Sequence, residues 1–279
     1  MSALIINTLQ GCGAEVSGVD LRQVTENEFD QIRQAFSEHG LLFFLGQELS
    51  ELDHIQFAEK WGKININRFF TAHENHPQIA MVTKEPEQDV NIGGGWHTDH
   101  SYDFEPALGS ILVARELPAT GGDTWFCNMY KAYDGLSEGL KETLLGLRAV
   151  HSARHVFGSV NADYEKASSG RITNSGAADV LADPVHPVVV KHPLSGKLCL
   201  YVNSAFTLRF EGWTAEESAP LLAYLYEQAP SEANVTKFKW QPGSVAFWDN
   251  RATWHYALND YQGQRREMHR ITIEGCALG

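Results

Sequence analysis

The sequence lacks the features that mark secreted, zinc-bound and membrane-spanning proteins. Its four cysteines, Cys12, Cys127, Cys199 and Cys276, lie far apart and form no CxxC pair. This spacing fits reduced, mostly buried thiols better than a disulfide framework or a zinc knot. No apolar run approaches the ~18 residues of a membrane span, and the first residues, MSALIINTLQ, lack the cationic start of a signal peptide. We therefore expect a cytoplasmic protein with no membrane partner.

Positive charge is scarce as well. The chain contains 22 Lys and Arg against 35 Asp and Glu, a formal net charge of −13, and no basic run offsets it. Because such a surface repels a phosphate backbone, nucleic acid is not expected as a partner. Hydrophobic residues at 43% and charged residues at 20% are ordinary for a soluble globular enzyme. Length and composition together predict one domain over residues 1–279.

Capping residues and apolar periodicity predict four helices. Three of them begin after Thr25, Ser50 and Thr214, and the fourth runs from Tyr130 to about Leu147. The first three begin with a Ser or Thr that an acidic residue follows three positions later, which is the pattern of a capping box. In each of the four, apolar residues then recur at helical spacing, so we expect amphipathic helices packed against a core.

Short apolar stretches between turn residues predict β-strands through the rest of the chain. They include LLFFL, IAMVT, SILVAREL, DTWFCN, SVAFWD and HRITIEG, and PVVVKHPLSGKLCLYV adds a hairpin around residues 193–196. Strands spread along the whole chain predict a mainly β fold with flanking helices, a sandwich or barrel of the jelly-roll type. A polar segment at about 158–185 is either disordered or a lid over a site, and we expect the lid.

A histidine and a carboxylate two residues apart, His97 and Asp99 in GGGWHTDHSYD, predict two ligands of one metal ion. Alternate residues of a strand point to the same face, so both side chains can reach one ion. His255 is the best candidate for a third ligand because it follows a buried strand and a turn. Two imidazoles and a carboxylate leave about three positions open, an arrangement that iron(II) uses in oxygen chemistry. Arg266 and Arg270 follow and could offer a guanidinium to a carboxylate.

Ordinary structural roles compete with this interpretation. With twelve histidines a chance HxD pair is not rare, and the two arginines could belong to a solvated basic turn. His151 and His155, at i and i+4 on an expected helix end, could hold zinc, but without a nearby carboxylate we expect packing or pocket lining. The glycines at 93–95 lack the lysine of a phosphate-binding loop and are expected to form a flap over the substrate.

Four motifs occur in the order WHTD, GGDTWF, WDNRATWHYA and QRREMHR, and GAEVSGVDL stands near the start. Together they resemble the taurine dioxygenase and 2,4-dichlorophenoxyacetate dioxygenase family of iron(II)/2-oxoglutarate-dependent oxygenases, over nearly the whole chain. The resemblance implies a double-stranded β-helix, a cupin-like jelly roll. It also implies the use of iron(II), 2-oxoglutarate and dioxygen, with release of succinate and carbon dioxide.

The resemblance assigns roles to six residues. Three positions match the family's iron ligands: His97, Asp99 and His255. Arg266 and Thr124 match the pair that holds the distal carboxylate of 2-oxoglutarate. Arg270 matches the arginine that helps to bind the substrate's anionic group in taurine dioxygenase. Relatives also make a homodimer or homotetramer an expectation.

Arg270 favours a small anionic substrate: a carboxylate, sulfonate, sulfate ester or phosphonate. Phe70, Phe104 and Phe206 could form an apolar wall for an alkyl or aryl body, although each could equally be ordinary core, and Tyr102 is a further candidate to face the substrate. Taurine dioxygenase contacts taurine through a histidine upstream of the HxD motif and an asparagine just before it. The comparable stretches here read NRFF and NIGGG, so taurine itself is not expected.

Two other functions fit parts of the pattern. A metal-dependent hydrolase could use the same three ligands on zinc, but it leaves Arg266 and Thr124 without a role. A non-catalytic jelly-roll protein could use the polar pocket only to capture a small acid. Dependence on dioxygen and stoichiometric succinate separates the oxygenase from both.

Overall fold

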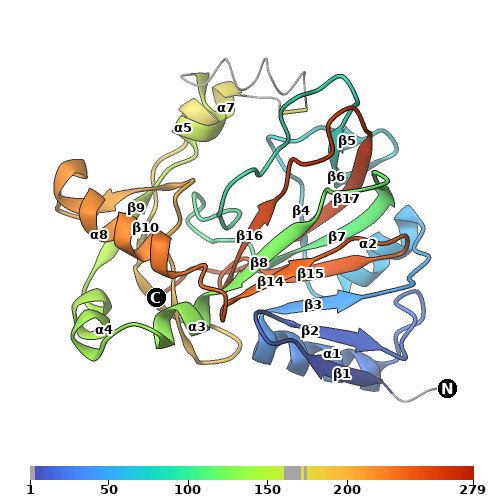
Figure 1. Ribbon diagram of the computed structural model, residues 1–279, viewed down its shortest axis with the longest axis horizontal. Coiled ribbons are helices and arrows are strands. Elements are labelled where there is room, and N and C mark those ends of the chain that lie inside the picture. Colours follow the sequence, from blue (N-terminus) through green and yellow to red (C-terminus); the bar gives the residue numbers. More distant parts are fainter. Residues whose placement is uncertain (1–3, 160–170, 173–174) are drawn as a thin grey trace.

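Two sheets face each other at the centre of the molecule, and their strands pair antiparallel except for the parallel pair of β2 with β3 (Figure 1). The computed structural model describes residues 4–159, 171–172 and 175–279. In order across the larger sheet lie β1 (Ile5–Thr8), β2 (Ala14–Ser17), β3 (Leu41–Phe44), β15 (Val245–Asp249), β7 (Gly109–Glu116), β17 (Arg266–Ile273), β6 (His76–Lys84) and β5 (Ala72–His73), with β4 (Ile64–Asn65) on β17. The facing sheet contains β14 (Val235–Phe238), β8 (Thr124–Asn128) and β16 (Thr253–Ala257). This is the predicted jelly roll.

Apolar side chains from both sheets form the core between them. Phe126 of β8 meets Phe43 of β3 at 5.5 Å between ring centroids and Trp248 of β15 at 5.7 Å. All three side chains are buried. The strand pattern therefore places one face of each sheet against the other, and the open end between them is where a site can form.

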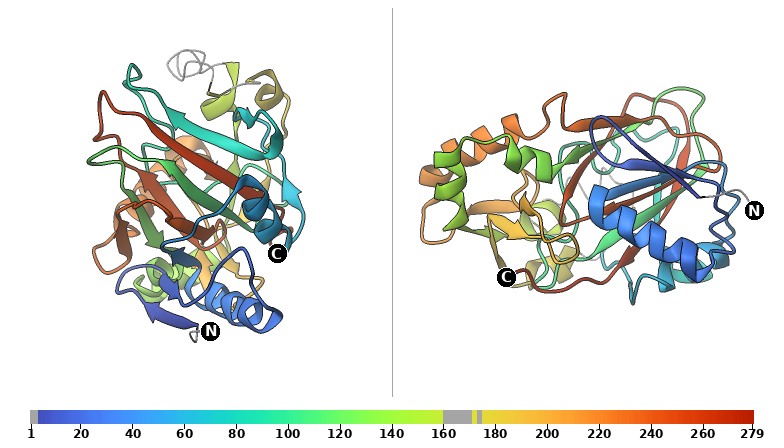
Figure 2. Two further views of the ribbon diagram at one scale, coloured as in Figure 1. Left: turned by 90° about the vertical axis from the view of Figure 1, so that its right-hand side faces the viewer. Right: turned by 90° about the horizontal axis from the view of Figure 1, so that it is seen from below.

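Two helices cover the outer face of the larger sheet, α1 (Glu26–His39) and α2 (Glu51–Glu59), as the side view in Figure 2 shows. Phe36 of α1 stacks on Phe247 of β15 with ring centroids 4.1 Å apart. The predicted capping boxes at Thr25 and Ser50 are both present, which confirms where these helices begin. In α2 the residues His54, Ile55, Phe57 and Ala58 are buried, whereas the apolar Leu52 in the first turn is exposed.

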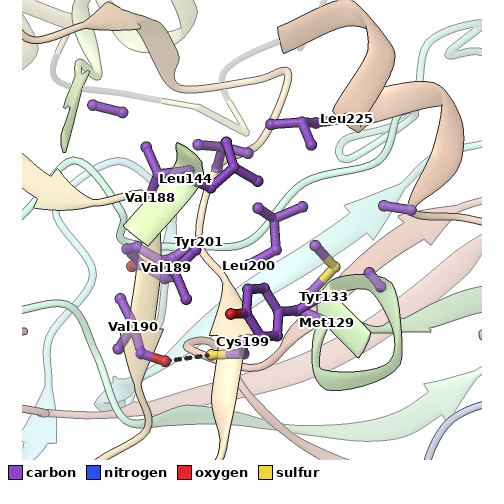
Figure 3. Close-up of a cluster of buried hydrophobic side chains, with 14 of the residues drawn as sticks. Met129, Tyr133, Leu144, Val188, Val189, Val190, Cys199, Leu200, Tyr201 and Leu225 are labelled. Carbon is purple, nitrogen blue, oxygen red and sulfur yellow. Dashed lines mark hydrogen bonds between the residues drawn. The ribbon is translucent and has the colours of Figure 1, made fainter. Parts of the chain in front are cut away.

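A second apolar core fills the other side of the molecule, between two small sheets and the later helices (Figure 3). The hairpin of β11 (Val189–Lys191) and β12 (Leu198–Leu200), predicted from its turn, packs there on α3 (Met129–Asp134). The remaining elements are α4 (Glu138–Leu145), β9 (Arg148–His151), α5 (Arg154–Phe157), α7 (Ser175–Asp179), β10 (Val185–Pro187), β13 (Thr207–Phe210) and α8 (Ala215–Gln228). The capping box that opens α8 at Thr214 is also confirmed.

The single helix predicted from Tyr130 to Leu147 is wrong. The chain forms α3 and α4 with a break at residues 135–137, because Gly135 ends the first helix and Ser137 begins the second. All four cysteines are free thiols, and three of them are buried, as predicted, whereas Cys276 is exposed. In the described ranges no helix is both long and apolar enough to span a bilayer.

The polar segment predicted as a lid, 158–185, lies partly outside the described residues, which omit 160–170 and 173–174. Its described part contains α7 and the start of β10. Phe70 forms an isolated bridge with Ile172, so this part of the segment contacts a residue that the sequence placed near the substrate.

A buried charge cluster closes the end of β15. Asp249 Oδ2 accepts from Arg251 Nη2 at 2.7 Å and lies 3.0 Å from His192 Nε2, and all three residues are buried. Burial opposes the charge on Asp249, but Arg251 and His192 outweigh it and hold the pKa of this carboxyl well below its usual range. The Asp249 carboxylate therefore supplies the negative charge that balances the buried Arg251 guanidinium.

Asp249→Asn should lower the free energy of unfolding by about 3–5 kcal/mol, because it leaves the Arg251 charge buried without a counter-charge. The folded-state pKa is depressed, so the deficit is fully present above the unfolded pKa of about 4 and shrinks as the pH falls below it. Urea denaturation at pH 7 and pH 3 measures both effects. The exposed Asp134→Asn should change stability by less than about 0.5 kcal/mol, and a deficit for Asp249→Asn no larger than this contradicts the expectation.

Candidate metal centre and active site

Two remote pieces of chain meet at the open end between the sheets. His97 and His255 form an isolated antiparallel bridge, with His97 N donating to His255 O at 3.1 Å and His255 N to His97 O at 2.8 Å. His255 lies on β16, while His97 lies in the loop before β7. These backbone hydrogen bonds fix the two imidazoles beside each other, 4.1 Å apart between ring centroids.

Asp99 completes a group of three donors. His97 Nε2 lies 3.8 Å from Asp99 Oδ1, and His255 Nε2 lies 3.8 Å from Asp99 Oδ2. One ligand atom of each residue lies within 4.8 Å of the others, which is close enough for a single ion. The structure therefore brings together the three residues that the sequence predicted as metal ligands.

The histidines also have the chemical form that a metal needs. His97 Nδ1 lies 2.8 Å from the carbonyl oxygen of Gly95, which accepts only from an N–H, so Nδ1 carries a proton and Nε2 is the atom that can bind a metal. Burial, followed by the proximity of His97, lowers the pKa of His255 well below its ordinary value and keeps its imidazole neutral. Two imidazoles and a carboxylate fit iron(II).

Asp99 carries its negative charge in this setting. Burial opposes ionisation, but Arg270, His255 and His97 outweigh it and hold the pKa of Asp99 well below its usual range. Arg270 Nη1 donates to Asp99 Oδ2 at 2.9 Å, and the Arg270 guanidinium carbon lies 4.3 Å from the centroid of the Phe70 ring. The Arg270 guanidinium thus contacts both a metal-ligand candidate, Asp99, and an apolar side chain, Phe70.

The glycines before His97 have a packing role. Gly93 has φ +81°, and a Cβ added to it would lie 3.2 Å from His97 Cε1, so only glycine fits beside this ring without strain. Gly93 O accepts from Ala257 N at 3.0 Å, which ties the loop to β16. Residues 93–95 also line the cavity, where the sequence placed a flap.

Arg266 and Thr124 lie across the same cavity. Arg266 is 5% exposed, and its Nε and Nη2 have no hydrogen-bond partner in the part of the chain that the structure describes. Thr124 Oγ1 accepts from Trp240 Nε1 at 2.9 Å, which leaves the hydroxyl proton free to donate. Gly122 permits this arrangement because its φ is +73° and a Cβ would lie 3.2 Å from Arg266 Cδ. Unpaired donors of this kind suit a carboxylate.

The cavity has a volume of about 290 Å³. Its walls include the three metal-ligand candidates, Thr124, both arginines and many apolar residues, among them Phe70, Phe157, Phe206, Val82, Ile92 and Leu112. The predicted wall residues Phe70 and Phe206 are therefore present. Tyr102 is buried behind Phe206, with ring centroids 4.8 Å apart, and does not reach the cavity.

Phe104 does not belong to this cavity. Phe104 is 65% exposed and lines a separate hollow with His100 and Asp103. The chain turns there because His100 takes a left-handed conformation, with φ 61°, and its Nδ1 lies 2.8 Å from Asp103 Oδ2. The turn directs the residues after Asp99 away from the donors, so strand alternation could not be extended to them.

His151 and His155 do not share a helix face, contrary to the sequence prediction. His151 is a buried residue of β9, and its Nδ1 lies 3.4 Å from Thr207 Oγ1. His155 lies on α5, where its ring contacts the carbonyl oxygen of Ala205. Both histidines therefore have packing and hydrogen-bonding roles, which was the expected alternative.

A second group of metal-type donors consists of Glu51, His73 and His269. It differs from the first group because the positively charged guanidinium of Arg115 already lies beside its donors. Arg115 Nε donates to His269 Nδ1 at 3.0 Å, and Arg115 Nη2 lies 3.7 Å from Glu51 Oε1. The guanidinium thus engages the atoms that an ion would need.

The sequence prediction missed several wall residues, among them the large aromatics Trp248 and Phe157. Trp248 lines the cavity, packs on His255 with ring centroids 4.8 Å apart, and has a buried indole N–H with no partner among the described residues. Phe157 stacks on Phe69 and also faces the cavity. Trp248 lies in the buried run SVAFWD, where an alternation rule cannot tell which residues face the site.

Comparison with known proteins agrees with this geometry. The family model described as taurine catabolism dioxygenase TauD, TfdA family, matches residues 6–272. An alkylsulfatase of Acinetobacter baylyi is 35% identical over 266 residues, which cover 94% of this chain and 82% of that protein. An alpha-ketoglutarate-dependent sulfate ester dioxygenase of Pseudomonas putida is 32% identical over 265 residues, covering 94% and 86%.

A solved structure shares the fold over its whole length. The crystal structure of a taurine dioxygenase from Burkholderia xenovorans aligns with a TM-score of 0.82 and 31% identity, covering 99% of this chain and 93% of that one. Alpha-ketoglutarate, named for the Pseudomonas relative, is 2-oxoglutarate. The chain therefore belongs to the TauD/TfdA family and is an iron(II)- and 2-oxoglutarate-dependent dioxygenase.

Proposed function

We propose that this enzyme hydroxylates a small organic anion with an apolar body, beside an iron(II) ion held by His97, Asp99 and His255. Arg266 and Thr124 would hold the second carboxylate of 2-oxoglutarate. Arg270 would face the anionic group of the substrate. One observation carries the proposal: the three donors and both buried arginines line one largely apolar cavity.

The chain supplies orientation and a dry environment. When bound, iron(II) supplies the chemistry by which 2-oxoglutarate and dioxygen give succinate, carbon dioxide and an oxidised substrate. Arg266 offers two unpaired nitrogens, Nε and Nη2, and Thr124 one hydroxyl, which together can fix a carboxylate at a set distance from the metal-ligand candidates. Phe70, Phe157 and Phe206 exclude water on the substrate side.

An organic sulfate, sulfonate, phosphonate or carboxylate fits this wall better than taurine does. The cavity offers phenylalanine, valine, isoleucine and leucine side chains to the body of the substrate, and these surfaces disfavour an ammonium group. Two relatives carry names that refer to sulfate esters, which supports the sulfate ester among these anions. A hydrolase is not favoured, because hydrolysis leaves the unpaired donors of Arg266 and the hydroxyl of Thr124 without a role.

A panel of substrates tests the proposed reaction. Alkyl sulfates, alkyl sulfonates, alkyl phosphonates and aryloxyacetates are each incubated with iron(II), ascorbate and 2-oxoglutarate under air. We expect succinate to form in amounts equal to the oxidised product with at least one anionic class, and much less with the neutral alcohol of the same chain length or with taurine. Equal rates for anions and alcohols would remove the role given to Arg270.

Arg270→Met should raise KM for the anionic substrate by about 10- to 150-fold, the loss expected for a hydrogen bond to a charged group worth about 1.5–3 kcal/mol. The KM of the neutral alcohol should change much less, because the alcohol has no negative charge for the Arg270 guanidinium to bind. Because Arg270 also contacts Asp99, Mn(II) affinity is measured separately by titration, and KM is taken at saturating metal.

Arg33→Gln is the matched control. Arg33 also places its guanidinium over a phenylalanine ring, 5.9 Å from the Phe29 centroid, but it lies exposed on α1. It should leave both KM values unchanged. If Arg270→Met raised KM for the anion and the alcohol by the same factor, the arginine would be a part of the wall and not the receptor of the anion.

A further inference from the structure

Lys84 is a buried charge that the proposed reaction leaves without a role. It is the last residue of β6, it is 2% exposed, and its ammonium has no hydrogen bond or ion pair within the described ranges. The ammonium lies 4.6 Å from the centroid of the Tyr261 ring. A buried, unpaired ammonium is costly, and one aromatic ring offsets only part of that cost. Its presence therefore needs an explanation.

Lys84 is the direct partner of Arg266. In the antiparallel pairing of β6 with β17, Arg266 lies opposite Lys84. Directly opposed residues of such a pair point to the same face, with Cβ atoms about 4.5–5.5 Å apart. Two buried cations thus stand side by side, and Arg266 is the residue proposed to hold the second carboxylate of 2-oxoglutarate.

A small hollow joins the two cations. Lys84, Arg171, Tyr261 and Arg266 line it, and we call it the basic hollow. Its volume is about 10 Å³, about the room of one water molecule, so it is too small for an organic ligand. Arg266 also lines the large cavity. The positive charge of Lys84 therefore attracts an anion bound on the cavity side of Arg266, although Lys84 does not line the large cavity and does not contact that anion.

Among the described residues, Lys84 and Arg266 form no ion pair. Arg171 also lines the hollow, where it donates to two carbonyl oxygens, Thr83 O at 3.0 Å and Val90 O at 2.7 Å. Asp89 and Asp123 act on this group from a distance, but neither forms an ion pair with Lys84 or Arg266. Like charges this close repel one another, and an anion placed beside Arg266 relieves that repulsion.

We propose that Lys84 is a positioning residue for the co-substrate, whose buried positive charge makes the site select a 2-oxo acid that carries a second carboxylate. The proposal rests on the placement of 2-oxoglutarate at Arg266. Lys84 raises the affinity for the dianion through its field, and it contributes nothing to the part of the co-substrate that both mono- and dicarboxylic 2-oxo acids share.

The test compares two ligands that differ only in the second carboxylate. Binding of 2-oxoglutarate and of 2-oxopentanoate to the Mn(II)-loaded enzyme is measured by calorimetry for the wild type and for Lys84→Met. We expect the Kd of 2-oxoglutarate to rise about tenfold, the order of a screened attraction between one added charge and the second carboxylate, and the Kd of 2-oxopentanoate to change less than about twofold. The co-substrate-free variant should melt at a higher temperature than the wild type, because an unpaired buried charge has been removed.

Lys237→Met is the matched control. Lys237 also lies over an aromatic ring, 4.4 Å from the Trp125 centroid, but it is exposed on β14. It should change neither Kd. Lys84→Gln replaces the methionine variant if that one does not fold, and failure of both to fold overturns the proposal, since it shows a structural requirement for the ammonium.

The outcomes separate this inference from the proposed function. An equal loss of affinity for both 2-oxo acids, or no loss for either, overturns the role of Lys84. If Arg266→Ala weakens 2-oxoglutarate binding while Lys84→Met does not, only the inference about Lys84 fails. If neither variant weakens it, the placement of the co-substrate at Arg266 fails as well.

Discussion

His255→Ala should lose turnover by at least about 1000-fold, because the ion contributes several kcal/mol to the reaction and each 1.4 kcal/mol corresponds to a factor of ten. The side chain provides one of three donors, and its neutral imidazole has no other partner among the described residues at Nδ1. Loss of one donor leaves His97 and Asp99 to hold the ion alone. Succinate formation with the best anionic substrate measures the loss.

The fold should survive this change. His255 contributes its backbone to the bridge with His97, which alanine retains, and its ring faces a cavity that already exists. We expect a destabilisation of about 1–2 kcal/mol from lost contacts with Trp248. His73→Ala, in the second donor group, should retain activity. Full activity of His255→Ala, or loss of activity in His73→Ala, would place the reacting ion elsewhere.

Arg266→Ala should raise the Kd of 2-oxoglutarate by about 30- to several thousand-fold. Removing one partner of a buried, hydrogen-bonded charge pair costs about 2–5 kcal/mol. Arg266 is buried and its Nε and Nη2 have no partner in the described chain, so nothing nearby replaces its guanidinium. Calorimetric titration of the Mn(II)-loaded variant measures the change without turnover.

The adjacent arginine provides a control at the same strand. Arg265 is partly exposed and forms ion pairs with Glu85, Glu116 and Glu267, so its charge is already compensated. Arg265→Ala should alter the Kd of 2-oxoglutarate by less than about threefold, as expected for a surface pair. A similar loss in both variants would show that the general positive charge of this strand, and not the Arg266 guanidinium, binds the co-substrate.

The group of three donors could be anticipated from local patterns. The sequence paired His97 with Asp99 as alternate residues of an expected strand and added His255, which follows a predicted buried strand and a turn. The structure brings the three donors together although His97 and Asp99 lie in a loop and His255 lies within β16. Capping boxes likewise located the starts of α1, α2 and α8. These features need only neighbouring residues and their chemistry, so one sequence is enough to find them.

The substrate wall could be anticipated only in part. Phe104 was grouped with Phe70 and Phe206, yet the positive φ of His100 turns it to the outer surface. Trp248 lies in a strand buried on both faces, where periodicity carries no directional signal. The expected long helix is broken between Gly135, the C-cap of α3, and Ser137, the N-cap of α4, in spite of the leucine spacing. Each of these features is determined by tertiary packing or by a single backbone angle, and a pattern of neighbouring residues does not report either.

Titration of the metal-free protein with Mn(II), followed by electron paramagnetic resonance, tests most directly whether His97, Asp99 and His255 hold one ion. We expect one tightly bound ion per chain in the wild type. His97→Ala, Asp99→Ala and His255→Ala should each weaken it at least about 100-fold, and Glu51→Gln, in the second donor group, should bind it as the wild type does. Undiminished binding by any of the three alanine variants would contradict the assignment.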